Sequence, residues 1–359
     1  MSKVLVAMSG GVDSSVTLLK IIEMGHQPIG ITMKLWEYKF VGGNNLQDNN
    51  CCAIESINNA KLVCERLGVP HYTIDFTEDF REKVVENFVS EYTSGRTPNP
   101  CVRCNSYVKW DTFIKQADKL GAEYIATGHY AIINENNGAY SIKRGKDAVK
   151  DQAYVLWGIP KNTLSRTILP LGELTKKEVR NIARENSLET ADTPESMEIC
   201  FVADNNYSRF IKEYTNRQDE EEGTTLDESN NIVGKNPVYI NYTIGQRKGI
   251  GVTNPEPLYV KKINAKENTI TVSKKNGLLS DFCKISNINW LIESPSFPIK
   301  VNCQIRYNGN VSKTLIDSNN DTITATFETP QLAITPGQSI VFFDNEETLL
   351  GGGVIEIYD

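Results

Sequence analysis

The chain has 359 residues, of which 40% are hydrophobic and 23% charged, and its formal net charge is −7. This composition is typical of a soluble protein with two or three domains, and the acidic balance argues against a generally basic nucleic-acid binder. Local basic surfaces remain, because residues 143–150 and 241–262 each hold four Lys or Arg against one acid. Eight cysteines in a chain this long do not make a disulfide scaffold. Because the chain has no long apolar run, we expect a cytoplasmic protein without a membrane partner.

The first predicted elements are a strand, a tight turn and a helix. Val4 to Met8 form a short apolar run, which predicts a buried parallel strand. Two glycines and a serine follow, and then apolar residues recur at helical spacing. These helical positions are Val16, Leu18, Leu19, Ile22 and Met24.

The turn between them, "SGGVDSS" (9–15), favours phosphate binding over an ordinary strand–helix connection. Gly10 and Gly11 allow close approach of a ligand, and the N–H groups at a helix start favour an anion. Ser9, Ser14 and Ser15 add hydroxyl donors. No lysine follows the glycines, so the turn is not a Walker A loop. It resembles the PP-loop of ATP pyrophosphatases, which implies cleavage of ATP between the α and β phosphates.

Strand-like and helix-like segments continue to alternate through the first 130 residues. Residues 28–35, 71–76 and 124–130 are predicted strands, and helical apolar spacing separates them. This alternation predicts an α/β domain with a doubly wound parallel sheet, whose ligands bind beyond the carboxyl ends of the strands. The helical faces comprise Ile54, Ile57, Ala60, Cys64 and Leu67, and then Phe80, Val84, Phe88 and Tyr92.

After about residue 205 the helical periodicity gives way to short β-rich runs with turn residues. We expect a small β-rich central domain, then a carboxyl-terminal barrel or sandwich, with the barrel as the preferred form. The predicted domains are 1–205, 206–278 and 279–359.

A second informative stretch is "SGRTPNPCVRCN" (94–105), in which Cys101 and Cys104 form a CxxC. Cys200 lies far off in "ESMEICFV" (195–202). A loop position beside cations favours a reactive thiolate. A zinc site is an alternative, although three cysteines leave a tetrahedral set incomplete. Another alternative is structural burial, which we expect for Cys64, Cys283 and Cys303.

Seven motifs occur together in one order along the chain. With these motifs the chain resembles the bacterial tRNA-specific 2-thiouridylases of the MnmA type over essentially its whole length. The motifs are the PP-loop, "RTPNPCVRCN", "ATGHY" (126–130), "KDQAYVL" (150–156), "EICFV" (198–202), "YTIGQRKGIG" (242–251) and "TPGQS" (335–339).

The resemblance implies ATP-dependent 2-thiolation of the wobble uridine, position 34, in the tRNAs for Lys, Glu and Gln. ATP, with Mg²⁺, adenylates the C2 oxygen, and AMP is then a good leaving group. By resemblance Cys200 carries a persulfide from a sulfur donor protein. Cys104 releases the sulfur through a transient disulfide with Cys200.

The resemblance also implies binding residues for each ligand. The direct role of Asp13 stays open between two alternatives: it caps the helix, or it lies near the magnesium ion. The implied ATP-binding residues are Ala7, Met8, Ser9, Gly10, Gly11, Val12, Asp13, Ser14, Met33 and Gly128. The implied tRNA-binding residues are Asn99, Pro100, Cys101, His129, Lys150, Asp151, Gln152, Arg306, Tyr307 and Gln338, of which Asn99 and Pro100 meet a flipped-out target base. For His129, Arg306 and Tyr307 a purely structural role is the alternative.

One position departs from the family pattern, because many members carry Asp where Cys101 stands. Three thiolates, from Cys101, Cys104 and Cys200, can hold a [4Fe–4S] cluster with one open iron. A cluster-bound sulfide would then replace the persulfide. We therefore weigh two mechanisms, with the persulfide relay preferred.

Two other classes of function remain open. Another PP-loop ligase or amidotransferase, acting on a small molecule, would have no use for Cys104 and Cys200. A non-enzymatic RNA-binding module would leave the PP-loop unexplained.

Overall fold

The computed structural model describes residues 1–36, 54–194, 199–202, 204–217, 222–319 and 322–356. The chain forms two compact units, and each contains segments that are far apart in sequence. The first unit comprises Met1–Val85, Cys101–Asn206 and Glu346–Leu349, and the second comprises Glu86–Pro100, Tyr207–Asn345 and Leu350–Asp359. The three predicted domain ranges stay a prediction.

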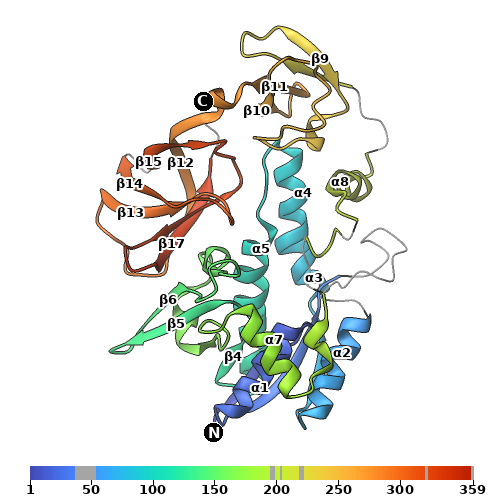
Figure 1. The fold of residues 1–359 in the computed structure, drawn as a ribbon, viewed down its shortest axis with the longest axis vertical. Coiled ribbons are helices and arrows are strands. Elements are labelled where there is room, and N and C mark those ends of the chain that lie inside the picture. The colour runs from blue at the N-terminus through green and yellow to red at the C-terminus, as the bar shows by residue number, and fades with distance from the viewer. Residues whose placement is uncertain (37–53, 195–198, 203, 218–221, 320–321, 357–359) are drawn as a thin grey trace. The chain divides into compact units, whose positions relative to one another are not determined.

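Figure 1 shows the helices and strands. The α-helices are α1 (Val12–Glu23), α2 (Ile54–Arg66), α3 (Thr77–Phe80), α4 (Glu86–Thr93), α5 (Pro100–Arg103), α6 (Phe113–Lys119), α7 (Lys176–Glu185) and α8 (Tyr207–Thr215). Two π-helical segments cover Arg81–Val85 and Cys104–Thr112, and short 3₁₀ turns cover Ala153–Leu156, Lys161–Arg166, Glu189–Asp192, Tyr239–Asn241 and Lys275–Leu278. In the part of the chain that is described, no helix is long and apolar enough to cross a membrane.

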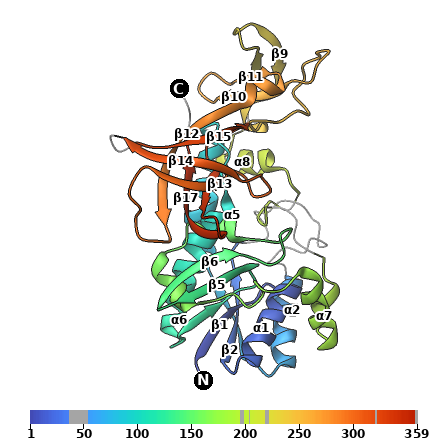
Figure 2. The same ribbon diagram turned by 60° about the vertical axis from the view of Figure 1, so that its left-hand side comes forward.

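A parallel sheet forms the centre of the first unit, in the order β3-β2-β1-β4-β7. Alternate residues of β1 face opposite sides, and Val4 and Val6 join the core that α1, α2 and α7 cover. Helix α6 lies on the other side (Figure 2). The predicted doubly wound sheet is therefore confirmed. Its strands are β1 (Lys3–Ala7), β2 (Gln27–Lys34), β3 (His71–Asp75), β4 (Tyr124–Ala126) and β7 (Thr167–Ile168).

Two predicted elements of this region differ in detail from the structure. The segment 77–93 is not one regular helix, since a π-helical turn lies between α3 and α4. Its buried residues recur every four positions. On a regular α-helix this spacing would rotate the buried face by about 40° at each step. The wider π turn offsets that rotation. The strand predicted over 124–130 ends at Ala126, after which the Thr127 N–H bonds to the Ile168 carbonyl.

A hairpin that the sequence analysis did not predict completes the first unit. Strands β5 (Ala131–Asn136) and β6 (Ala139–Arg144) are joined by Asn137 and Gly138, both with positive φ, as a two-residue hairpin turn requires. Strand β6 then pairs with Thr348 and Leu349 from the far end of the chain.

The second unit holds two β structures and the unpredicted helix α8. A small sheet has the order β10-β11-β8-β9, and a barrel has the order β12-β15-β14-β13-β16-β17, closed by pairing of β12 with β17. Bulges in the long strand β12 let it pair on both sides. The preferred barrel is therefore confirmed. The strands are β8 (Gly223–Leu226), β9 (Ile232–Asn236), β10 (Tyr259–Asn264), β11 (Thr269–Ser273), β12 (Leu279–Trp290), β13 (Ile299–Gln304), β14 (Ser312–Asn319), β15 (Thr322–Leu332), β16 (Ser339–Phe343) and β17 (Thr348–Ile355).

Candidate active site

The glycine turn joins β1 to α1 at the carboxyl edge of the sheet. Gly11 is the N-cap of α1, in extended conformation, and no side chain caps the helix. Gly10 has φ +78°, and a Cβ there would lie 2.1 Å from the Ser56 carbonyl oxygen. Only glycine fits this position. The result is a helix start whose first-turn amides receive no side-chain cap, as an anion-binding turn requires.

The serines of the turn are arranged around Gly11. Ser14 Oγ and Ser15 Oγ donate to the Gly11 carbonyl oxygen at 2.9 and 3.0 Å. Ser9 Oγ donates to Ser14 Oγ at 3.3 Å, and Thr190 Oγ1 donates to the buried Ser15 at 2.8 Å. These bonds fix the turn without occupying its amide groups.

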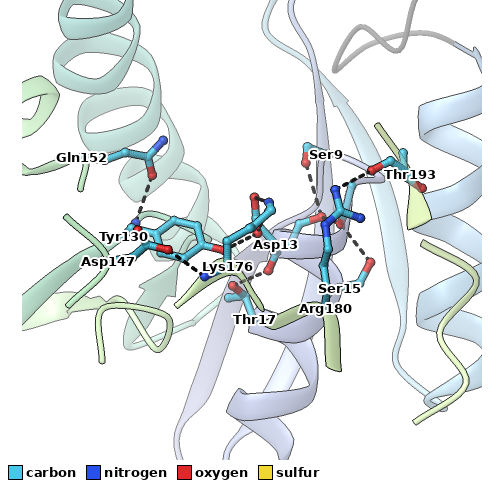
Figure 3. Close-up of polar contacts among 12 residues, drawn as sticks. Ser9, Asp13, Ser15, Thr17, Tyr130, Asp147, Gln152, Lys176, Arg180 and Thr193 are labelled. Carbon is cyan, nitrogen blue, oxygen red and sulfur yellow. Dashed lines mark hydrogen bonds and ion pairs between the residues drawn. The ribbon is translucent and has the colours of Figure 1, made fainter. Parts of the chain in front are cut away.

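An ion pair that the sequence analysis did not predict lies beside this turn. Lys176 Nζ contacts the two carboxylate oxygens of Asp13 at 2.8 and 2.7 Å, and Tyr130 Oη donates to Oδ1 at 2.7 Å (Figure 3). The Lys176 side chain is 12% exposed. Because Gly11 is the N-cap, Asp13 does not cap α1. A lysine at this place brings a cation to the predicted phosphate-binding turn, as the P-loop lysine does in another fold.

The sequence contains a signal for the position of Lys176 in the fold, but it contains none for the role of this lysine. Thr175 and Glu178 form a capping box, in the Thr-x-x-Glu pattern that marks a helix start. This pattern locates Lys176 in the first turn of α7, but its contact with Asp13 depends on the tertiary fold.

The other predicted nucleotide contacts lie near the same edge. A Cβ on Gly128 would be 3.1 Å from Asp13, so the turn after β4 lies directly against the PP-loop. The two turns, each at the carboxyl end of a strand of the parallel sheet, are therefore in contact. Met33 lies on β2, buried at 8% exposure. The remaining loop residues, Ala7, Met8 and Val12, form the end of β1, the turn and the start of α1.

The candidate catalytic residues Cys104 and Cys200, and the possible cluster ligand Cys101, are free thiols. Cys101 is exposed in α5, Cys104 is buried at the start of the π-helical segment, and Cys200 is half-buried in a turn. A π-helical segment is itself common at functional sites. Within the described residues, which include these three, no three His, Cys, Asp or Glu side chains gather as a metal-binding group. The [4Fe–4S] alternative on Cys101, Cys104 and Cys200 stays a prediction.

The expected structural cysteines contrast with these. Burial raises the pKa of Cys64 to about 12, with Glu65 adding to the effect, and burial raises the pKa of Cys283 to about 12. Burial also raises the pKa of Cys303. Their predicted structural burial is confirmed.

Comparisons with known proteins agree along the whole chain. Residues 2–204 match the family described as "tRNA methyl transferase HUP domain", residues 208–274 its PRC-barrel domain, and residues 280–355 an "Aminomethyltransferase beta-barrel domain". The "tRNA-specific 2-thiouridylase MnmA" of Carboxydothermus hydrogenoformans is 44% identical and covers 99% of this chain and 97% of its own length. Those of Salinibacter ruber (44%) and Amoebophilus asiaticus (42%) cover 99% and 98% of this chain, and 94% and 95% of their own.

The chain belongs to the tRNA-specific 2-thiouridylase family. The resemblance drawn from the seven motifs is thereby confirmed.

The predicted tRNA-contact positions in the first unit have structural partners here. His129 is 7% exposed, bonds to Thr127 Oγ1 through Nδ1 at 2.7 Å and packs on Trp110. Burial holds its pKa well below the usual value, with Lys109 adding to the effect. Asp151 pairs with Arg144 at 2.7 Å. The predicted tRNA contacts of this group, with Lys150, stay predictions.

Gln152 and the basic run 143–150 also serve the fold. Gln152 Oε1 accepts from the Tyr130 N–H at 3.0 Å. Lys143 and Lys146 pair with Glu346 and Glu178. Much of the local positive charge in this run is thus balanced by acids of the same unit.

The remaining predicted tRNA contacts belong to the second unit. Arg306 Nη2 donates to the carbonyl oxygens of Leu332 and Ala333 at 2.9 and 2.5 Å, and Tyr307 is 39% exposed. Asn99 and Pro100 follow α4, and Gln338 lies in the turn before β16. These assignments stay predictions as well.

Proposed function

We propose that this protein is an ATP-dependent tRNA-uridine 2-sulfurtransferase that thiolates C2 of the wobble uridine. The observation that carries the proposal is the uncapped PP-loop with its Lys176–Asp13 pair, in the same unit as Cys104 and Cys200. Some family descriptions name a methyl transferase, but a phosphate-binding turn and two thiols suit adenylation and sulfur transfer.

The first step uses ATP. The uridine C2 oxygen attacks the α-phosphate, which forms a C2–O–AMP linkage and releases pyrophosphate. The PP-loop amides and Lys176 suit the negative charge of the phosphates. Mg²⁺, when bound, would be held through the phosphates and would neutralise their charge. Asp13 contacts Lys176 Nζ through both carboxylate oxygens and orients it.

The second step transfers sulfur, and its electrons balance through Cys104. A sulfur donor protein supplies a persulfide on Cys200, whose terminal sulfur attacks C2 and displaces AMP. The Cys104 thiolate then attacks Cys200 Sγ, which breaks the S–S bond to the substrate, leaves 2-thiouridine and forms a Cys104–Cys200 disulfide. A thiol reductant restores both cysteines. We propose the tRNAs for Lys, Glu and Gln as substrates.

The first experiment incubates the protein with ATP, Mg²⁺, a persulfide source, dithiothreitol and unmodified tRNA for Lys, Glu or Gln, and measures 2-thiouridine and pyrophosphate. Cys200→Ser should abolish thiouridine and leave pyrophosphate release, because activation needs no sulfur. Asp13→Ala should reduce both. Cys283→Ser, a buried barrel thiol, is the matched control and should leave both products unchanged.

Two outcomes would contradict the proposal. Pyrophosphate released without tRNA would indicate a PP-loop ligase for a small molecule. Loss of activity in Cys101→Asp, together with iron in protein purified without oxygen, would favour the cluster mechanism. Under the persulfide relay, Cys101→Asp keeps its activity, since the family tolerates Asp there.

A further inference from the structure

Backbone groups of the loop that carries Asn99 and Pro100 form hydrogen bonds to the turn before β16 of the barrel. Gln338 Nε2 donates to the carbonyl oxygens of Thr97 and Pro98 at 3.1 and 2.8 Å. The Thr97 N–H donates to the Pro336 carbonyl at 2.9 Å. All these residues lie in the second unit. Each hydrogen of the Gln338 amide thus has one carbonyl acceptor.

Gly337 allows this contact. It has φ +88°, and a Cβ there would lie 2.7 Å from the Thr97 carbonyl oxygen and 2.8 Å from Glu91 Oε2. No other residue would let the turn before β16 approach the loop so closely.

Arg96 attaches the start of the same loop. Its Nε contacts Glu91 Oε2 at 2.6 Å, and Nη1 and Nη2 contact the two Glu356 oxygens at 2.6 and 3.2 Å. The Arg96 side chain is 14% exposed. Ser286 donates a short hydrogen bond to Glu356. A planar guanidinium between two carboxylates fixes the direction of the chain more rigidly than a lysine would.

The pKa values agree with this geometry. Burial alone would raise the pKa of Glu356, but its hydrogen bonds from Arg96 and Ser286 outweigh burial and lower it. Burial would likewise lower the pKa of Arg96, and the bonds to Glu356 and Glu91 raise it. Both groups are therefore held in their charged forms.

We propose that Gln338 and Arg96 are positioning residues that hold residues 96–100 on the barrel, so that Asn99 and Pro100 meet the target uridine in one fixed geometry. This inference rests on the proposed function. It gives Gln338 a different role from the tRNA contact that the family resemblance implies, because its amide hydrogens are used within the protein.

The test compares Gln338→Met, which keeps side-chain length but has no donor, with Arg96→Lys, which keeps charge but not the two-sided geometry. Asn302→Leu is the matched control, since its amide donates to Asp344 and Asn345 of the barrel. The measurements are the rate of 2-thiouridine formation at saturating tRNA, the Kd for tRNA, hydrogen exchange in peptides covering 94–100, and Tm.

We expect Gln338→Met to lower the rate at saturating tRNA by about 100-fold, which is the effect of a misplaced binding group. Because misplacement affects the reaction more than binding, the Kd for tRNA should change by less than about twofold. Exchange over 94–100 should rise in Gln338→Met and Arg96→Lys but not in Asn302→Leu. If Gln338→Met does not fold, Arg96→Lys carries the same test.

Two results would overturn the inference. Unchanged exchange over 94–100 in the folded variants would do so whatever the activity. A weaker Kd with full rate at saturating tRNA would make Gln338 a tRNA contact instead. If the wild type forms no 2-thiouridine, the proposed function fails, and the exchange measurement still decides whether these residues hold the loop.

Discussion

At the scale of single residues, the charge arrangement at the PP-loop depends on Lys176 and Asp13, which lie 163 positions apart. Lys176 is nearly buried, and Asp13 is its partner at both carboxylate oxygens. Removing one side chain of the ion pair leaves the charge of the other uncompensated at a partly buried position. The pair thus connects the start of α7 to the turn that we expect to hold ATP.

Lys176→Met should lower the rate of tRNA-dependent pyrophosphate release by about 10²–10³-fold, the usual effect of losing one preorganised donor at a site of developing charge. Lys177→Met is the control, because Lys177 is exposed in the same turn of α7. Equal rates in wild type and Lys176→Met would contradict a role for this lysine.

At the scale of elements, the capping box of α7 fixes where Lys176 stands. The Thr175 N–H and Oγ1 donate to Glu178 Oε2 at 2.6 and 2.8 Å. These bonds, with Lys146 nearby, lower the pKa of Glu178 from 4.5 to about 2. A carboxyl group with a depressed folded-state pKa stabilises the fold fully above its unfolded pKa. This contribution is therefore complete above about pH 4.5 and is lost as the pH falls toward 2.

Thr175→Ala should lower the free energy of unfolding by about 1 kcal/mol at pH 7, as the loss of an N-cap does. The difference from wild type should shrink below pH 4.5, because Glu178 becomes protonated in the unfolded chain before it does in the folded protein. Urea denaturation at pH 7, 5 and 3.5 measures both effects. Thr215→Ala is the control, because its hydroxyl donates to a backbone carbonyl and its effect should not vary with pH.

At the scale of the whole molecule, burial separates the described cysteines other than Cys104, which is itself buried, into two groups. Cys64 in the first unit and Cys283 and Cys303 in the barrel are buried, with raised pKa values. Cys101 is exposed and Cys200 half-buried. Burial in two separate cores thus keeps the structural thiols protonated, whereas Cys101 and Cys200 are more accessible and lie in the same unit as the PP-loop.

Brief treatment of the native protein with iodoacetamide at pH 7.5 should therefore modify Cys101 and Cys200, and mass spectrometry of peptides should find Cys64, Cys283 and Cys303 unmodified. Unfolding in urea should expose all five to labelling. Rapid labelling of Cys283 or Cys303 in the native protein would contradict the barrel packing. Cys51 and Cys52 lie outside the described residues.

The sequence by itself determined the local elements and the identity of the PP-loop. The apolar run before Ser9 and the glycines after it predicted β1, the turn and α1, because these patterns act over a few residues. The motifs likewise indicated the family before any contact was known. The β5–β6 hairpin also has a local sequence signal, the Asn137–Gly138 pair at its turn.

Only the tertiary structure decided which distant groups meet. The pairing of Lys176 with Asp13, of β6 with residues 348–349, and of Gln338 with the 97–98 carbonyls joins segments 163 or more residues apart. No local periodicity encodes such contacts, because they are set by how the packed elements bury apolar surface and satisfy backbone groups. For this reason Lys176 was missed, and the hydrogen bonds from Gln338 to the 97–98 carbonyls were not foreseen, while its expected tRNA contact stays a prediction.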